Sequence, residues 1–174
     1  MTMVSAVPFT RREYMQLPEG FPAQLIEGAL IRDPAPVLPH QVLVTRILLA
    51  FVDHVGGDRV LPAPVDLFLD DLNVYQPDVM VFDREVRLDP TIREAEKPLL
   101  VVEVLSPSTA AYDCGVKAPR YLEWGVREIW LVDADAGTVD VRGPGGISRT
   151  GPDGVVRSTA TPGLEVDVAR LFRS

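Results

Sequence analysis

Two acidic side chains stand within apolar stretches of the sequence, where charges are uncommon. Glu103 interrupts the apolar run of residues 99–105, and Asp78 follows Pro77 inside the apolar run of residues 74–82. If both runs are strands of one sheet, pairing of the strands can bring the two carboxylates side by side. Carboxylate oxygens and water are the ligands that Mg²⁺ prefers, and a bound Mg²⁺ promotes phosphodiester hydrolysis by lowering the pKa of water and offsetting charge on the phosphate.

An aspartate and a lysine downstream could complete such a site. Asp113, Lys117 and Tyr121 are spaced four apart, so on a helix all three share one face. Of the 17 basic residues only two, Lys97 and Lys117, are lysines. Because the chain uses arginine at nearly every other basic position, a lysine at position 117 indicates a need for a compact ammonium there. An ammonium beside a metal site can orient the attacking water or stabilise the transition state.

The elements that must position these groups form one strand–turn–helix–strand unit. The turn-forming segment 106–109 ends the first strand. A helix that ends at Gly125 follows, and the apolar residues 127–133 predict a second buried strand. Pro119 lies inside the helical segment, which indicates either a bend there or an α-helix that begins near Ala118 with the proline in its first turn.

The rest of the sequence alternates short strands and helices. The clearest signal is an amphipathic helix from His40 to residue 55, in which apolar residues recur every three or four positions. Pro62 and Pro64 confine any strand over residues 60–69 to a sheet edge or a bulge. The other predicted segments are a capped helix from residue 10 that ends at Pro18, one bent or two short strands over 23–32, a strand over 74–82, a polar loop over 83–97, a short strand over 138–142, a mobile hairpin over 143–154, and a strand at 164–168 followed by a short helix.

The composition predicts an ordered globule. The 174 residues are 47% hydrophobic and 24% charged, which suits a single domain over residues 1–174 with a loose segment at residues 1–9. The net charge of -8 argues against a broad basic face for duplex DNA, although a local arginine cluster is compatible with it. A lone cysteine, Cys114, and the lack of a signal peptide or of an apolar run of about 20 residues predict a cytoplasmic protein without a membrane span.

Four segments of the sequence also carry a longer pattern. They are residues 76–78, residues 102–109, the triplet Asp113, Lys117 and Tyr121, and residues 125–133. Together they resemble the Uma-type restriction-endonuclease family of the PD-(D/E)XK nuclease superfamily, and the resemblance runs from about Phe9 to Phe172. It implies an α/β fold of the α+β-like kind, with a mixed β-sheet flanked by helices and a restriction-endonuclease-like core.

The same resemblance implies a site and a substrate. It implies activity on DNA and a Mg²⁺ site, with Mn²⁺ as a substitute ion, in which Asp78 and Glu103 hold the metal and the Val104 carbonyl is a third ligand. In most of the superfamily the lysine follows the glutamate by two residues on the same strand, where this chain has Leu105. The Uma-type pattern places the lysine on the following helix instead, and Lys117 matches that position.

One residue departs from the family pattern. The family usually has a glutamate where this chain has Gln24, whose amide oxygen can accept a hydrogen bond or touch a metal but carries no charge. Glu27 is a nearby carboxylate that could substitute for it. Strand alternation, however, points Glu27 to the opposite face from Gln24.

Each of these residues also has a plainer interpretation. Asp78 and Glu103 could be solvated carboxylates at strand ends, and Asp113 with Lys117 could be an ordinary helix pair worth about 0.3 kcal/mol. The other residues singled out are predicted to be structural: His40 a surface residue at a helix start, Cys114 a structural thiol, and Tyr121 and Trp130 core side chains.

The sequence therefore predicts a Mg²⁺-dependent endonuclease acting on DNA. In this interpretation Asp78 and Glu103 hold the metal, Lys117 supports the attacking water, and Gln24 lines the pocket. A homodimer is expected if both strands of a duplex are cut, because one chain carries one site. Two alternatives stay open. One is a nuclease-fold binding or scaffold module whose site is weakened at Gln24; the other is a phosphodiesterase acting on RNA or small diesters, with which the acidic net charge is compatible.

Overall fold

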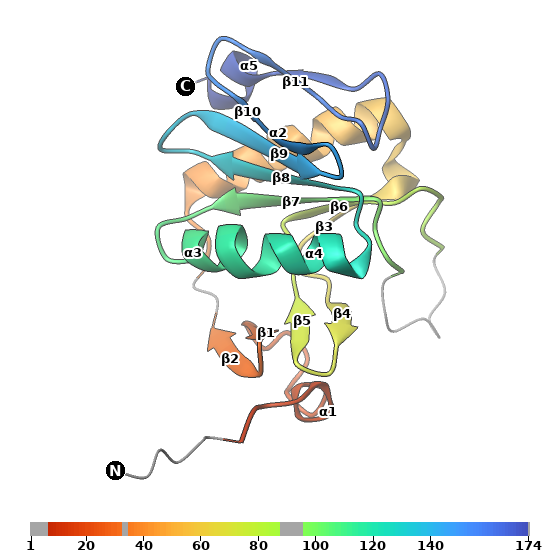
Figure 1. Ribbon diagram of the computed structural model, residues 1–174, viewed down its shortest axis with the longest axis vertical. Helices are drawn as coiled ribbons and strands as arrows, with labels where there is room; N and C mark the ends of the chain where they lie inside the picture. Colours follow the sequence, from red (N-terminus) through yellow and green to blue (C-terminus); the bar gives the residue numbers. More distant parts are fainter. Residues whose placement is uncertain (1–6, 33–34, 88–95, 174) are drawn as a thin grey trace.

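The centre of the structure is a six-stranded mixed sheet (Figure 1). The computed structural model describes residues 7–32, 35–87 and 96–173. In this sheet β7 and β8 run parallel, because a helical segment carries the chain back across one face, and the other neighbouring strands are antiparallel. In spatial order the strands are β10 (Gly146–Thr150), β9 (Thr138–Gly143), β8 (Glu128–Asp133), β7 (Leu100–Leu105), β6 (Val79–Val81) and β3 (Val60–Pro62).

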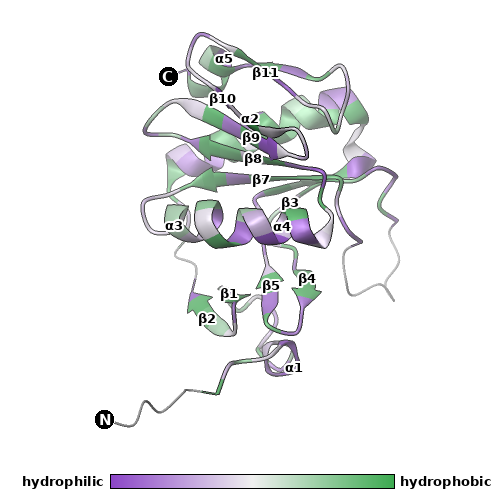
Figure 2. Ribbon diagram, in the orientation of Figure 1, coloured by the Kyte–Doolittle hydropathy of each residue, from purple (hydrophilic) through white to green (hydrophobic). Residues whose placement is uncertain are grey.

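Helices cover both faces of this sheet. On one face lies α2 (Leu38–Val55), which begins two residues before the predicted start and ends at Gly56. It packs into a core cluster with β7 and β8, in which the rings of Phe51 and Trp130 have centroids 5.1 Å apart. Figure 2 shows hydrophobic stretches on α2, β7 and β8. Strands covered on both faces are expected to be apolar over nearly their whole length, as β7 and β8 are.

The segment that covers the other face is helical throughout and changes its winding once. It comprises α3 (Ala110–Tyr112), the π-helical turn η2 (Asp113–Lys117) and α4 (Ala118–Trp124). Pro119 lies in the first turn of α4, as one of the two predicted alternatives has it, although helical backbone also precedes it. In a π turn the Cys114 carbonyl would accept the N–H of residue 119, which proline lacks. The guanidinium of Arg142 donates to that carbonyl instead, at 2.7 Å.

A four-stranded antiparallel sheet lies beside the central sheet, below it in Figure 1. Its strands are, in spatial order, β2 (Ala29–Arg32), β1 (Ala23–Ile26), β5 (Asn73–Tyr75) and β4 (Leu67–Asp70). Residues 23–32 therefore form two strands of a hairpin. Its two-residue turn has positive φ at Glu27 (50°) and Gly28 (77°), which is the geometry that tight hairpin turns require.

The ends of the chain carry short elements. Before the small sheet, α1 (Arg11–Tyr14) begins with the predicted capping box, in which the Glu13 carboxylate accepts the Thr10 N–H at 2.7 Å. The helix ends four residues before Pro18. The remaining elements are η1 (Gly57–Arg59), a 3₁₀ turn after α2, the pair β11 (Val155–Arg157) and β12 (Glu165–Asp167), and the terminal helix α5 (Val168–Phe172).

Two predicted strands are each divided between the two sheets. The prediction of one strand over residues 74–82 is wrong, because β5 belongs to the small sheet and β6 to the central sheet. The chain changes sheet at residues 76–78, where Pro77 has no N–H for a ladder. Asp78 therefore lies just before β6 and not inside a strand. Residues 60–69 divide in the same way into β3 and β4, with Pro64 between them.

Three further expectations concern segments outside the main elements. Residues 1–6 of the segment predicted to be loose lie outside the described residues, but Phe9 is held, because its N–H donates to the Gly28 carbonyl at 2.8 Å. Residues 88–95 of the predicted polar loop also lie outside them. Residues 143–154 contain the regular strand β10, paired with β9. Among the described helices, none is long and apolar enough to cross a membrane.

Candidate active site

Asp78 and Glu103 meet at the ends of neighbouring strands. In the antiparallel pair β6 and β7, Val79 lies opposite Val102, so the same register places Asp78 opposite Glu103. The Asp78 Oδ2 atom accepts the backbone N–H of Val104 at 2.7 Å. One carboxylate is thus fixed to the strand that carries the other. This is the arrangement that the paired acidic positions predict.

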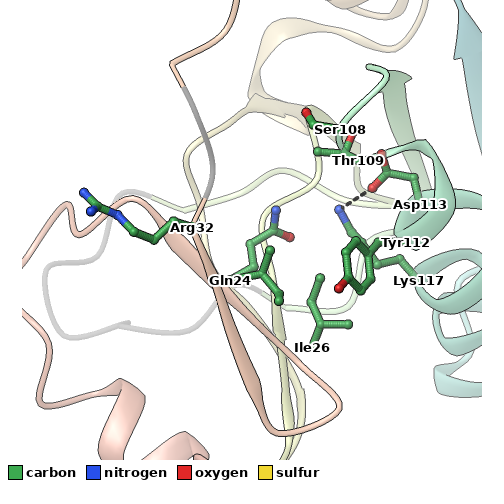
Figure 3. Close-up of a pocket in the computed structure, with 9 residues that line it drawn as sticks. Gln24, Ile26, Arg32, Ser108, Thr109, Tyr112, Asp113 and Lys117 are labelled. Atoms are coloured by element: carbon green, nitrogen blue, oxygen red, sulfur yellow. Dashed lines mark ion pairs between the residues drawn. The ribbon is translucent and has the colours of Figure 1, made fainter.

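Lys117, on the helical segment that packs over β7, also contacts Glu103. The Lys117 side chain is 2% exposed, and its Nζ atom lies 2.7 Å from Glu103 Oε1 and 3.0 Å from Asp113 Oδ1. The Tyr121 hydroxyl donates to the same Glu103 oxygen at 2.8 Å. In Figure 3 a dashed line joins the Lys117 ammonium to the Asp113 carboxylate. The spacing of four residues therefore places all three helix side chains around Glu103.

This cluster contains more acidic than basic side chains. Burial, with the nearby charges of Asp113 and Asp78, raises the pKa of Glu103 to about 8, and Lys117 opposes that shift. Burial by itself would lower the pKa of Lys117, but the charges of Glu103 and Asp113 outweigh it and raise the pKa. The ammonium is therefore a fixed cation. A further cation beside Glu103 would favour its charged form, so the site gains from one.

His40 joins the site, and here the prediction of a surface residue is wrong. Its side chain is 15% exposed, and Nε2 lies 3.4 Å from Asp78 Oδ2. The hydrogen bond to Asp78 raises the pKa of His40, although burial acts in the opposite direction. Nδ1 is buried without a hydrogen-bond partner in the described part of the chain. The sequence indicates only that His40 lies at the start of a long helix. Its place at the site could not be predicted, because the cleft forms only when that helix packs against β7.

Gln24 lies on β1 and is buried at the same site. Its Oε1 atom accepts the N–H of Gln76 at 2.8 Å. Through that bond it holds the segment that leads to Asp78. Glu27 lies in the hairpin turn with its side chain 58% exposed, 3.9 Å from Arg120, so it does not replace Gln24 at the site.

One cleft of about 1050 Å³ joins these residues where the two sheets meet. Its lining includes Asp78, Glu103, Val104, His40 and Lys117. Ser106, Ser108 and Thr109, from the turn after β7, add hydroxyl groups to the same wall.

The donor set of this cleft fits a hard divalent cation. Asp78 and Glu103 each have one oxygen engaged by the protein, and among the described residues the second oxygen of each makes no hydrogen bond or ion pair. Within those residues no three His, Cys, Asp or Glu side chains gather to hold a metal. A closed zinc site of four nitrogen or sulfur ligands therefore does not fit. Two carboxylates, the Val104 carbonyl and water suit Mg²⁺ or Mn²⁺, which keep several waters.

Of the other three residues predicted to be structural, Trp130 and Cys114 are structural, and Tyr121 also contacts the site. Trp130 is fully buried in the core, with Nε1 donating to Glu128 Oε1 at 2.7 Å. Cys114 is a partly buried free thiol whose pKa is raised by burial, which disfavours the reactive thiolate. Tyr121 does both, because its ring packs edge-on against Tyr75 at 5.4 Å while its hydroxyl binds Glu103.

Comparisons with known proteins agree with this architecture. A solved structure described as "a putative nuclease belonging to DUF820", from Anabaena variabilis, superposes with a TM-score of 0.81 at 25% identity, covering 95% of this chain and 98% of that one. This neighbour confirms the predicted mixed α/β fold. "Uncharacterized protein slr1290" of Synechocystis sp. is 37% identical over 89 residues, a match that covers 47% of this chain and 44% of that protein.

The family comparison covers nearly the whole chain. The model of the family described as "Putative restriction endonuclease" matches residues 11–169. That span contains all the candidate site residues described above, which are Gln24, His40, Asp78, Glu103, Val104, Asp113 and Lys117. The chain therefore belongs to the Uma2 family.

Proposed function

We propose that this chain is a Mg²⁺-dependent endonuclease that hydrolyses phosphodiester bonds in DNA. The family description and the structural neighbour support a nuclease; the metal and the DNA substrate are the proposal. One observation carries it: Asp78 and Glu103 converge from neighbouring strands in one cleft, with the Lys117 ammonium 2.7 Å from Glu103. A carboxylate pair beside a cation is what hydrolysis of a charged diester requires.

The roles of the residues follow from their contacts. Asp78 and Glu103 would hold Mg²⁺ or Mn²⁺ with the Val104 carbonyl as a third ligand, and Gln24 and His40 position Asp78 from two sides. When bound, the cation would lower the pKa of water and offset charge on the phosphate. Lys117 orients Glu103 through their ion pair.

Lys117 acts as a donor in this proposal and not as a base. Its pKa is raised by two carboxylates, so it keeps its proton at neutral pH. Two of the three ammonium N–H groups have partners in Glu103 and Asp113. Among the described residues the third N–H has no hydrogen-bond partner, and we assign it to an attacking water or a phosphate oxygen.

A nuclease-fold binding module is the second candidate, and Gln24 favours it. The amide oxygen of Gln24 already accepts the Gln76 N–H, and the residue brings no charge to the site. A site with one carboxylate fewer binds a divalent cation more weakly. Such a protein would bind a nucleic acid without turnover.

The test is cleavage of DNA, RNA and a chromogenic diester with and without Mg²⁺ or Mn²⁺. We expect cation-dependent cleavage of DNA that falls to background in Asp78→Asn and stays unchanged in Asp153→Asn, which alters an exposed aspartate before β11. Faster cleavage of RNA or of the small diester would move the substrate to the alternative class. No cleavage of any substrate, with binding retained, would favour the binding module.

Two further parts of the proposal concern assembly and location. If both strands of a duplex are cut, two copies of the chain are needed, and a homodimer is then proposed. We also propose a cytoplasmic location, on the ground that Cys114 is a free thiol.

A further inference from the structure

The lining of the cleft includes an aromatic ring and a guanidinium that make no contact with the carboxylate cluster in the described residues. Phe21 lies just before β1, and Arg32 ends β2. Pairing of Ala23 with Arg32 brings the Arg32 guanidinium over the Phe21 ring, 5.8 Å from its centroid. Both residues line the cleft. Figure 3 shows the Arg32 side chain extending away from Gln24 and Lys117, so it is placed for a different part of the substrate.

The cleft lining also contains rigid, apolar residues. Four prolines and Val37 line the cleft, and Val37 is 66% exposed. The prolines come from four separate segments: Pro22, Pro36, Pro64 and Pro107. Flat, stiff apolar surfaces of this kind suit the faces of nucleic-acid bases, and stacking on an aromatic side chain is worth about 1–3 kcal/mol per base. In a duplex those faces are already stacked on one another and are not available.

The cleft also carries few positive charges that could contact the phosphates of a duplex. Lys117 is engaged by two carboxylates, so among the described residues that line the cleft Arg32 is the one Lys or Arg without an ion pair. Proteins that grip duplex DNA neutralise several phosphates with Lys and Arg. This cleft offers one such contact, on a chain of net charge -8.

We infer that the cleft takes an unpaired DNA strand and not a duplex. This inference rests on the proposed nuclease function and names its substrate. Bases lie on Phe21 and the proline walls, Arg32 holds one phosphate, and the phosphate to be cut lies at Asp78 and Glu103. The cleft volume of about 1050 Å³ slightly exceeds the range of about 300–1,000 Å³ that encloses small ligands, which leaves room for a few nucleotides. One strand needs one site, so this substrate does not require a homodimer.

The test is fluorescence anisotropy with a short labelled DNA strand and with the same strand annealed to its complement, in Ca²⁺ to allow binding without turnover. We expect the single strand to bind about tenfold or more tightly than the duplex. Phe21→Ala and Arg32→Gln should each weaken strand binding about fivefold or more. Phe21→Leu keeps the apolar bulk without the ring and should lose most of the same binding.

The chain offers a matched control for both variants. The guanidinium of Arg11 lies 4.5 Å from the Phe68 ring centroid, in a second Arg–Phe pair that does not line the cleft. Arg11→Gln and Phe68→Leu should leave strand affinity unchanged. Circular dichroism verifies that each variant is folded.

The outcomes separate this inference from the proposed function. Equal or tighter binding of the duplex, or strand affinity that is unchanged in Phe21→Ala and Arg32→Gln, would overturn the inference. If a duplex is then cleaved in a manner that depends on Asp78, the proposed nuclease function is supported and only the single-strand inference is overturned. Strand binding that depends on Phe21, with no cleavage of any substrate, would support the strand-binding cleft and overturn the proposed nuclease function.

Discussion

Lys117 shows how an ammonium can reach the glutamate from a second element. The residue two positions after Glu103 is Leu105, which packs beside the core on the α4 side. The helix that crosses this face of the sheet supplies the lysine instead. Its π turn spans Asp113–Lys117 and brings both side chains to within 3.0 Å of each other. π turns inside α-helices are often found at functional sites.

The first residue-scale prediction concerns that ammonium. Lys117→Met keeps the length and apolar stem of the side chain but removes its charge. Cleavage should fall on the order of 10²-fold or more, while Mn²⁺ affinity is kept or increased because the site becomes more negative. Steady-state rates and calorimetry measure the two effects. Lys97→Met alters the other lysine, near the Trp124 ring, and is the control; a similar loss there would argue against a specific role.

The second residue-scale prediction concerns Gln24. A glutamate at this position can still accept the Gln76 N–H and adds one negative charge to the cleft. Gln24→Glu should therefore tighten Mg²⁺ binding by about 1 kcal/mol and lower the stability of the metal-free protein, since the added charge then repels the other carboxylates of the cleft. Calorimetry and urea unfolding measure the two changes. Gln16→Glu, at an exposed position, should do neither; unchanged affinity and stability in Gln24→Glu would show that the residue lies away from the metal.

At the scale of elements, the sequence predicted the helices and strands that are marked by the periodicity and composition of their apolar residues. The helix α2 and the strands β7 and β8 were found because apolar residues mark them over their whole length. Sequence alone does not distinguish one bent strand from two short strands at residues 23–32, which form a hairpin. The division of residues 74–82 was missed, because a change from one sheet to another depends on what packs around the chain. His40 was missed for the same reason, since the cleft wall that it joins exists only after α2 packs on β7.

An element-scale prediction concerns the buried carboxylate at the start of β8. Glu128 Oε2 accepts hydrogen bonds from the Thr159 N–H at 2.7 Å, the Thr159 hydroxyl at 2.6 Å and the Ala160 N–H at 3.1 Å. Burial alone would raise the pKa of Glu128, but hydrogen bonds from Thr159 and Trp130 outweigh it and lower the pKa. These bonds tie β8 to the chain between β11 and β12.

The lowered pKa sets the sign of the pH dependence. The stabilising contribution of Glu128 is complete above the unfolded-state pKa near 4.5 and is lost as the pH falls through the lower folded-state value. Glu128→Gln should cost about 2 kcal/mol at neutral pH, and the difference from the natural protein should shrink in acid. Urea unfolding at a series of pH values measures this. Glu165→Gln, in an exposed ion pair with Arg157, should change stability little; a Glu128→Gln deficit independent of pH would contradict the assignment.

At the scale of the whole molecule, the site lies where the two sheets meet. The small sheet supplies Gln24 and Arg32, and strand β7 of the central sheet supplies Glu103. Asp78 comes from the segment just before β6, and Lys117 from the helix after β7. Motif spacing predicted the central-sheet and helix residues, because they are close in sequence to the strands that hold them. Motif spacing does not predict the side chains that come from the small sheet, because their position depends on how the chain passes from one sheet to the other at residues 76–78. The single domain over residues 1–174 stays a prediction, which one cooperative unfolding transition would support.

The most direct measurement of the central claim is isothermal titration calorimetry of Mn²⁺ and Mg²⁺. The unaltered protein should bind a single divalent cation per chain at this site. Asp78→Asn and Glu103→Gln should each weaken that binding sharply, because each removes one of the two carboxylate ligands. Asp153→Asn, at an exposed position outside the cleft, should leave it unchanged. Cation affinity that is the same in all four proteins would contradict the site.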